Sequence, residues 1–248
     1  MKRALNLKSL ALIVAALLAN SSSFAQFGAT PPGMDPSLTK LFGQNTAFSA
    51  GGQVAIQVAS QNQPMNVDMK VSMLEGKMRM EMDMSKLAGP GPGSQLRLMG
   101  MDQVVFISLP EKKMVLQVYP GLQGYMETTM PAAQAAGATK DYKIEKASLG
   151  KETIDAHACE KNKVTMTDDK GEKHEFVVWN AADLKDFPLR FQTTEQGNTI
   201  TVNYRDVKLD KPDAKLFEAP AGFTKYGSQM DLMQAVMARK TPGGPRIK

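Results

Sequence analysis

Hydrophobic and polar residues alternate with a period of two along much of this 248-residue chain, most clearly in the segment Val67–Met84. The segment reads VDMKVSML, then EG, then KMRMEMDM. Glu75 and Gly76 fit a two-residue turn, so the pattern predicts a β-hairpin. Its methionines and valines then point to one face, and its charged residues point to the other. Burying eight such side chains would contribute on the order of 12–24 kcal/mol, so something must cover this face.

The predicted turn also sets the register of the hairpin. The apolar pairs it creates are Met73–Met78, Val71–Met80, Met69–Met82 and Val67–Met84. On the polar face, Lys70 lies opposite Glu81 as a favourable charge pair.

Three interpretations of the methionine face stay open. Methionine is an adaptable filler, so the face can be the wall of a packed core. The same adaptability suits a lining that repacks around acyl chains of different length. Thioether sulfur also suits Cu(I), which makes a soft-metal (copper) site the third interpretation. Together with Trp179, a core or cavity-rim aromatic, the predicted ligand-binding residues are Met69, Val71, Met73, Met78, Met80 and Met82.

Other segments with a period of two predict further short strands. They are 54–58, 95–99, 103–109, 113–118, 142–149, 162–168, 173–179, 188–195 and 199–207. Turn residues at 168–171 and 195–198 join successive strands as hairpins, which implies an antiparallel meander. Short helices are expected at 36–42 after the cap Asp35, at 131–138 and at 229–240, and the Gly-Pro run 89–93 is expected to be a long loop.

About eleven strands and three short helices define a mainly β (α+β) fold. A large antiparallel sheet with one apolar face must curl, close or be filled by helices. We therefore expect a large curved antiparallel sheet, a half-barrel wrapped around short helices. The expected divisions are a signal peptide at 1–25, a flexible leader with a short helix at 26–47, one β domain at 48–226, and an amphipathic helix with a disordered tail at 227–248.

The N-terminal residues have the pattern of an export signal. Three basic residues accompany an apolar run from Leu10 to Ala19, and small residues at 23–25 predict cleavage before Gln26. The run has about ten residues, half of what a membrane-spanning helix needs, and no second run follows. We expect a periplasmic or secreted protein without a stable membrane span.

Charge argues against nucleic acid as a partner. The formal charge of +5 lies at the two ends of the chain, and residues 26–224 carry about −2. A nucleic-acid-binding domain would carry a basic patch on its folded body. Cys159 is the only cysteine, so an intramolecular disulfide is excluded.

Catalytic chemistry has little support in the residue pattern. His157 and Cys159 would share a face of an extended segment, but a nucleophilic pair needs a third, orienting group. A turn histidine beside a buried cysteine is the plainer interpretation. The chain contains no GxSxG, HExxH or P-loop pattern. We expect no enzyme, no metal site and no cofactor.

The C-terminal helix has two interpretations. Met230, Met233, Val236 and Met237 recur at helical spacing and form an apolar stripe. The stripe can plug the open side of the sheet, or the basic end of the helix can touch an anionic membrane or a partner.

The second half of the chain carries an ordered set of motifs. They are IDAHACEK (154–161), FVVW (176–179), FPLR (187–190) and LFEAPAGF (216–223), and KMRMEMDM and EKKMVLQVYP precede them. Together they resemble the LolA-like superfamily, secreted bacterial proteins related to the outer-membrane lipoprotein carriers, over about residues 48–226. The resemblance implies a curved sheet closed by helices over a hydrophobic cavity, which holds lipoprotein acyl chains in the carriers. No functional residue of the carriers is placed on this chain.

Two functions follow as expectations. The first is an exported, non-enzymatic protein that binds an apolar ligand, a lipid or lipoprotein acyl chain, in a methionine-rich cavity. The alternative is a structural or interaction protein whose core is filled by its own side chains.

Overall fold

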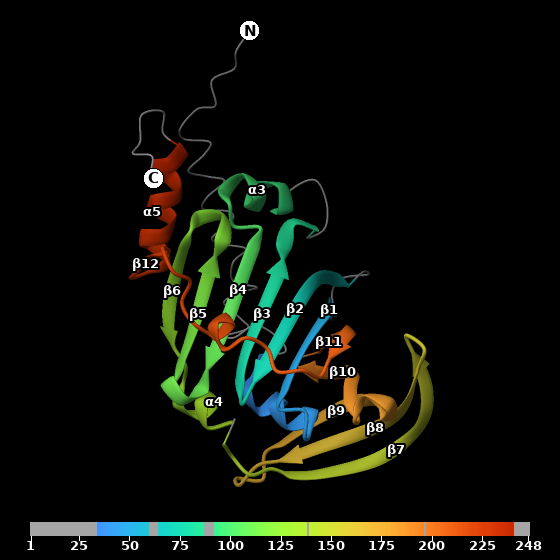
Figure 1. Cartoon of the computed structure of the whole chain (residues 1–248). Helices are drawn as coiled ribbons and strands as arrows, with labels where there is room; N and C mark the ends of the chain where they lie inside the picture. Colours follow the sequence, from blue (N-terminus) through green and yellow to red (C-terminus); the bar gives the residue numbers. More distant parts are fainter. Residues whose placement is uncertain (1–33, 60–63, 87–91, 138, 196, 241–248) are drawn as a thin grey trace.

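Twelve strands form one open, curved sheet in the computed structural model, which describes residues 34–59, 64–86, 92–137, 139–195 and 197–240 (Figure 1). The strand order is β12-β6-β5-β4-β3-β2-β1-β11-β10-β9-β8-β7. Neighbouring strands are antiparallel, except that β12 runs parallel to β6. The predicted fold class is confirmed. The predictions for residues 1–33 and for the tail at 241–248 lie outside the described residues.

The chain builds the sheet as two meanders. The first runs from the centre to one edge through β1 (Ala47–Gln57), β2 (Met65–Leu74), β3 (Lys77–Asp83), β4 (Gln103–Leu109), β5 (Met114–Tyr119) and β6 (Gly124–Thr129). The second returns from the opposite edge through β7 (Lys143–Ile154), β8 (His157–Thr167), β9 (Lys173–Ala181), β10 (Phe187–Glu195) and β11 (Asn198–Lys208). Because β11 pairs with β1, the two meanders join into one sheet.

Short helical segments connect and cover the strands. The 3-10 helices are η1 (Pro36–Phe42), η2 (Met84–Lys86), η3 (Pro110–Lys112), η4 (Pro120–Leu122), η5 (Ala182–Leu184) and η6 (Ala214–Phe217). The α-helices are α3 (Pro92–Met99), α4 (Ala132–Gly137) and α5 (Gln229–Lys240), and β12 spans Thr224–Tyr226. The predicted N-cap of η1 is confirmed, since the Asp35 side chain accepts a hydrogen bond from the Ser37 backbone amide.

The predicted methionine hairpin is confirmed in three of its four apolar pairs. The fourth predicted pair, Val67–Met84, lies beyond the ladder, because β3 ends at Asp83 and Met84 begins η2. Strands β2 and β3 pair Met69 with Met82, Val71 with Met80, and Met73 with Met78. Glu75 and Gly76 both have positive φ, as a two-residue turn of the mirror-image type requires. The register also places Lys70 opposite Glu81, although the ion pair that Glu81 makes is with Arg79 of its own strand.

The inner face of the sheet encloses η1. Phe42 of η1 packs against Phe48, Phe187 and Tyr204, with ring centroids 4.7 to 5.8 Å apart. Phe48 is paired with Met73, so the methionine face lies on the same side as this aromatic cluster. Methionine, valine and aromatic residues from both meanders therefore form one core around a short helix.

A second apolar layer lies on the outer face of the first meander. The segment that links β11 to β12 crosses this face, as Figure 1 shows, and η6 lies within it. Its Phe217 is buried with Ile107 and Leu116, and Arg79 donates to the Leu216 carbonyl. This segment thus covers part of the outer face, over β3, β4 and β5.

Two parts of the chain differ from the sequence predictions. Residues 95–99 form the end of helix α3 and not a strand, because Leu96 and Met99, three residues apart, pack against the core while Leu98 is 75% exposed. Residues 87–91, which include part of the predicted Gly-Pro loop, lie outside the described residues. Strands β6 and β12 had not been predicted.

The C-terminal helix exists as predicted, but a different stripe is buried. Leu232 and Val236, one turn apart, are buried in the main core. Met230 is 70% exposed and Met237 is also exposed. The helix lies beside β12 at the edge of the sheet (Figure 1).

Candidate ligand-binding site

Six of the seven predicted ligand-binding residues lie together on the inner face of the β2–β3 hairpin. We call this surface the inner wall, and it consists of Met69, Val71, Met73, Met78, Met80 and Met82. Each of these residues is at most 5% exposed. They belong to the same core as Leu38, Leu41 and Phe42 of η1, and Phe42 packs against Phe48, which is paired with Met73 of the wall.

Trp179 does not join the inner wall. Its strand register places it in one row with Arg190, Asn203 and Gln53, whereas its neighbour Val178 lies in the row of the buried Phe191. Successive residues of a strand point to opposite faces, so Trp179 lies on the outer face.

A group of charged side chains surrounds Trp179 on the outer face. Lys161 Nζ lies 4.8 Å and the Arg190 guanidinium carbon 5.3 Å from the ring centre. The indole Nε1 donates to Glu152 Oε2 over 2.7 Å. Cation–π contacts and a charge-assisted hydrogen bond fix the ring in place, which is a structural role.

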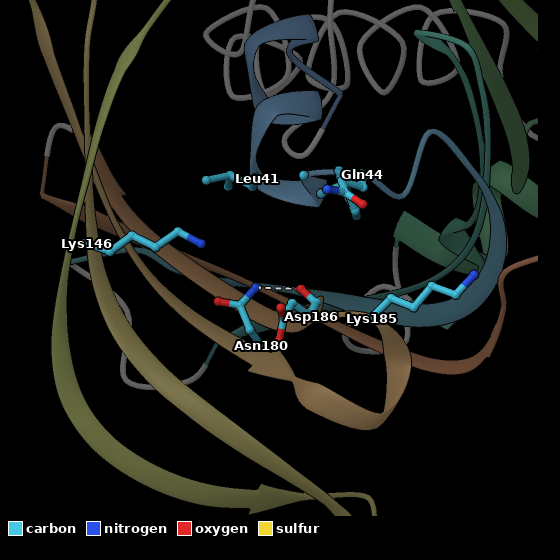
Figure 2. Close-up of a pocket in the computed structure, with 8 residues that line it drawn as sticks. Leu41, Gln44, Lys146, Asn180, Lys185 and Asp186 are labelled. Atoms are coloured by element: carbon cyan, nitrogen blue, oxygen red, sulfur yellow. Dashed lines mark hydrogen bonds between the residues drawn. The ribbon is translucent and has the colours of Figure 1, made fainter.

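A cavity of about 300 Å³ opens between the C-terminal end of η1 and the second meander (Figure 2). One side is formed by the end of η1 and the residues after it, and the other by β7, β9 and the loop after η5. Its lining residues are Leu41, Phe42, Gly43, Gln44, Lys146, Asn180, Lys185 and Asp186. None of them belongs to the inner wall, but Leu41 and Phe42 belong to the same core and connect the two.

The loop after η5 positions the polar side of this cavity. Lys185 and Asp186 both have positive φ, and together they turn the chain from η5 into β10. The Asp186 carbonyl accepts a hydrogen bond from Asn180 Nδ2 over 2.8 Å. The Lys185 carbonyl accepts one from the buried Asn45, which also donates to the Phe42 carbonyl. The side-chain amide of Asn45 therefore joins the loop to the end of η1.

Asn180 leaves one polar atom unpaired at the cavity. The Asp186 carbonyl can only accept, so the amide nitrogen of Asn180 must face it and the amide oxygen must point elsewhere. That oxygen, Oδ1, is buried and has no hydrogen-bond partner among the described residues. In Figure 2, it lies on the side from which Lys146 reaches into the cavity.

Two further buried hydroxyls lack a partner within the described part of the chain. They are Ser108 Oγ and Tyr204 Oη. Ser108 is paired with Met78, and Tyr204 is paired with Gly52, which pairs in turn with Met69, so both belong to rows of the inner wall. Burial raises the pKa of Tyr204, so its hydroxyl stays protonated.

The sequence reasoning missed the cavity residues. Lys146, Asn180 and Lys185 come from three different elements, and no spacing in the sequence joins them. Only Lys146 could have been noticed in the sequence. It lies two residues after Ile144, so it points to the same inner face of the strand although it is charged. Such a position would ordinarily hold an apolar residue.

His157 and Cys159 do not form a reactive pair. His157 Nδ1 lies 2.6 Å from Asp183 Oδ2, and the Cys159 thiol donates weakly to the backbone carbonyl of His157. Burial raises the pKa of the thiol, which opposes formation of a thiolate.

Within the described ranges, no group of three or more histidine, cysteine, aspartate or glutamate side chains is arranged to hold a metal ion. Nor do those ranges contain a helix with the length and apolarity that crossing a membrane would require.

Comparison with solved structures found several proteins that are similar to this chain over about three quarters of its length. A LolA superfamily protein from Nitrosomonas europaea is 12% identical, with 77% of this chain and 98% of that chain covered and a TM-score of 0.35. Lipoprotein LppX from Mycobacterium tuberculosis is 12% identical, with 73% and 100% covered and a TM-score of 0.36. LprF from Mycobacterium bovis is 13% identical, with 75% and 99% covered and a TM-score of 0.35.

A family also matches the sequence itself. The family described as "Domain of unknown function (DUF4412)" matches residues 51–187, which is more than half of the chain. The chain therefore belongs to this family. The comparison with curated proteins found no match.

Proposed function

We propose that this protein is an exported, non-enzymatic binding protein that takes a lipid or acyl chain between the inner wall and η1. The observation that carries the proposal is the inner wall itself. Methionine and valine side chains of β2 and β3 form one buried face, and methionine can repack around an inserted chain. The hydroxyls of Ser108 and Tyr204, which have no hydrogen-bond partner among the described residues, lie in rows next to this wall, where a polar group of a ligand can satisfy them.

The cover of the wall is suited to movement. Helix η1 is a 3-10 helix of seven residues, and such helices are uncommon beyond three or four residues because their hydrogen bonds are poorly aligned. Its C-terminal end is tied to the second meander through Asn45. Displacement of Leu38, Leu41 and Phe42 would expose the methionines, so η1 acts as the lid.

A reversible covalent lock on η1 tests this proposal. A Cβ atom built on Gly137 of α4 would lie 3.4 Å from Ser37 Cβ, close to the separation found in disulfides. The variant Ser37→Cys/Gly137→Cys should therefore form a disulfide that fastens η1 to α4. Cys159 is buried with a raised thiol pKa and should not compete.

The readout is uptake of a neutral fluorescent apolar probe, 1-N-phenylnaphthylamine, by delipidated protein. We expect the reduced double variant to take up the probe like the wild type and the oxidised form to lose most of that uptake. Ser37→Cys alone, treated with the same oxidant, is the matched control and should keep its uptake. Equal uptake by the locked and unlocked forms would refute the role of η1 as a lid.

A second function is favoured by one observation, the complete burial of the inner wall. If the core is filled permanently by its own side chains, the protein is a structural or interaction protein. In that case neither the wild type nor the reduced double variant takes up the probe.

A further inference from the structure

We propose that the ligand is an amphiphile whose head group combines a negative charge with a hydrogen-bond donor, and that this head group is held in the cavity by Lys146 and Asn180. This inference rests on the proposed function, since it places the apolar chain beneath η1. It assigns the head group to a part of the molecule that the inner wall does not reach.

The position of the cavity supports a division of the ligand into head and chain. Its lining includes Leu41 and Phe42, which also pack in the core that contains the inner wall. The remaining six lining residues are Gly43 and Gln44, which follow η1, and four residues of the second meander, Lys146, Asn180, Lys185 and Asp186. A molecule that enters along η1 would therefore have polar groups at its outer end and apolar contacts at its inner end.

Two lysines and one carboxylate line the cavity, namely Lys146, Lys185 and Asp186. Only one of the two lysines points toward Asn180 (Figure 2). Figure 2 shows Lys146 reaching inward from β7, whereas Lys185 extends away from Asn180. No ion pair occupies Lys146 in the described part of the chain, so its ammonium is available to a ligand. Lysine is a common partner for carboxylate and phosphate groups.

Asn180 adds the requirement for a donor. The residue is 6% exposed. Its Nδ2 donates to the Asp186 carbonyl, and its Oδ1 has no hydrogen-bond partner in the described ranges. A buried acceptor without a partner is unfavourable, and a ligand hydroxyl or N–H would relieve it. A purely anionic head group satisfies Lys146 alone, whereas an anion next to a hydroxyl satisfies both residues.

The experiment measures displacement of 1-N-phenylnaphthylamine from the wild type by four amphiphiles with the same sixteen-carbon chain. They are palmitoyl lysophosphatidate, its 2-deoxy analogue without the hydroxyl, hexadecanol and cetyltrimethylammonium. We expect lysophosphatidate to bind most tightly, with a threefold to tenfold loss (an order-of-magnitude estimate) for the 2-deoxy analogue. The cationic amphiphile should be the weakest competitor.

Variants identify the residues. Lys146→Met should weaken lysophosphatidate by about threefold to tenfold and leave hexadecanol unchanged. Lys143→Met is the matched control, because Lys143 lies on the same strand but pairs with Glu145 on the other face. Asn180→Leu should abolish the preference for the hydroxyl, and circular dichroism checks its fold.

The outcomes separate the two proposals. If the neutral probe does not bind, the proposed function fails. If the probe binds but all four amphiphiles displace it equally, the binding function stands and the assignment of Lys146 and Asn180 is refuted.

Discussion

The hairpins β2–β3 and β7–β8 are built alike and are buried very differently. Each has a two-residue turn with both residues at positive φ, Glu75-Gly76 in the first and Asp155-Ala156 in the second. The first lies in the middle of the sheet, and its inner face is buried in the core. The second forms the sheet edge, and eleven of the twelve residues of β7 are exposed. Local turn chemistry thus makes the hairpin, while position in the sheet and the inward side chains decide whether it is buried.

The difference has a functional meaning. On β2 and β3 the inward side chains are methionine and valine, whereas on β7 they include Lys146 and Ser148 beside Val164 and Asn162 of β8. The half-barrel is therefore sealed on the side of the first meander and accessible on the side of β7, where the cavity lies.

The largest expected effect is on stability. Met80 is fully buried in the inner wall, and Ile144 of β7 is 40% exposed. Met80→Ala should lower the free energy of unfolding by about 2–5 kcal/mol, because it leaves a cavity in the core. Ile144→Ala should cost less than about 1 kcal/mol. Urea unfolding compares the two, and equal losses would mean that β7 is as well packed as the hairpin.

High pH should destabilise the protein through Tyr119, which is buried at the end of β5. Burial raises the pKa of Tyr119 to about 12 from 10.0, so the folded state holds this proton more tightly than the unfolded state. The stabilisation that comes from this raised pKa is complete below pH 10 and is lost as the pH rises from 10 to about 12. The free energy of unfolding should fall by about 2–3 kcal/mol over that range. Tyr119→Phe should flatten this part of the stability curve.

The edge should respond to pH in the opposite range. The ion pair with Lys143 lowers the pKa of Glu145 on β7, so any stabilisation it gives is present at neutral pH and is lost in acid. Both groups are exposed, so salt should screen the effect. For the alkaline range, a Tyr119→Phe variant that still lost stability as steeply as the wild type above pH 10 would contradict the assignment of that loss to Tyr119.

The smallest expected effect compares the two turns directly. Gly76 and Ala156 both have positive φ, which glycine adopts freely and alanine does not. Gly76→Ala should destabilise the protein by about 1 kcal/mol, and Ala156→Gly should stabilise it by up to about 1 kcal/mol. No atom lies within 4 Å of a Cβ built on Gly76, so the first change tests backbone strain alone. Thermal unfolding measures both, and changes of the same sign would refute the comparison of the turns.

The sequence predicted those elements in which one pattern dominates. The hairpin register followed from the alternation around Glu75-Gly76, and helix α5 followed from its period of about 3.6. The short run around Leu96 fits both periods, and the contacts of Met99 with the core decided for a helix. In α5, the contact with the rest of the core selected Leu232 for burial and left Met230 exposed.

The candidate site was only half predictable. The inner wall follows from a local pattern, so its six residues were found together. The cavity depends on β7 and β9 meeting the end of η1, and Lys146 and Asn180 lie far apart in the chain. Trp179 was assigned to the ligand site by residue type, but the register places it on the outer face with Lys161 and Arg190.

The central claim is that the space behind η1 opens to receive an apolar chain. Uptake of 1-N-phenylnaphthylamine by the oxidised and reduced forms of Ser37→Cys/Gly137→Cys tests it most directly. The account predicts that uptake is lost when the disulfide forms and returns when it is reduced. Uptake that is the same in both states, or absent in both, would contradict it.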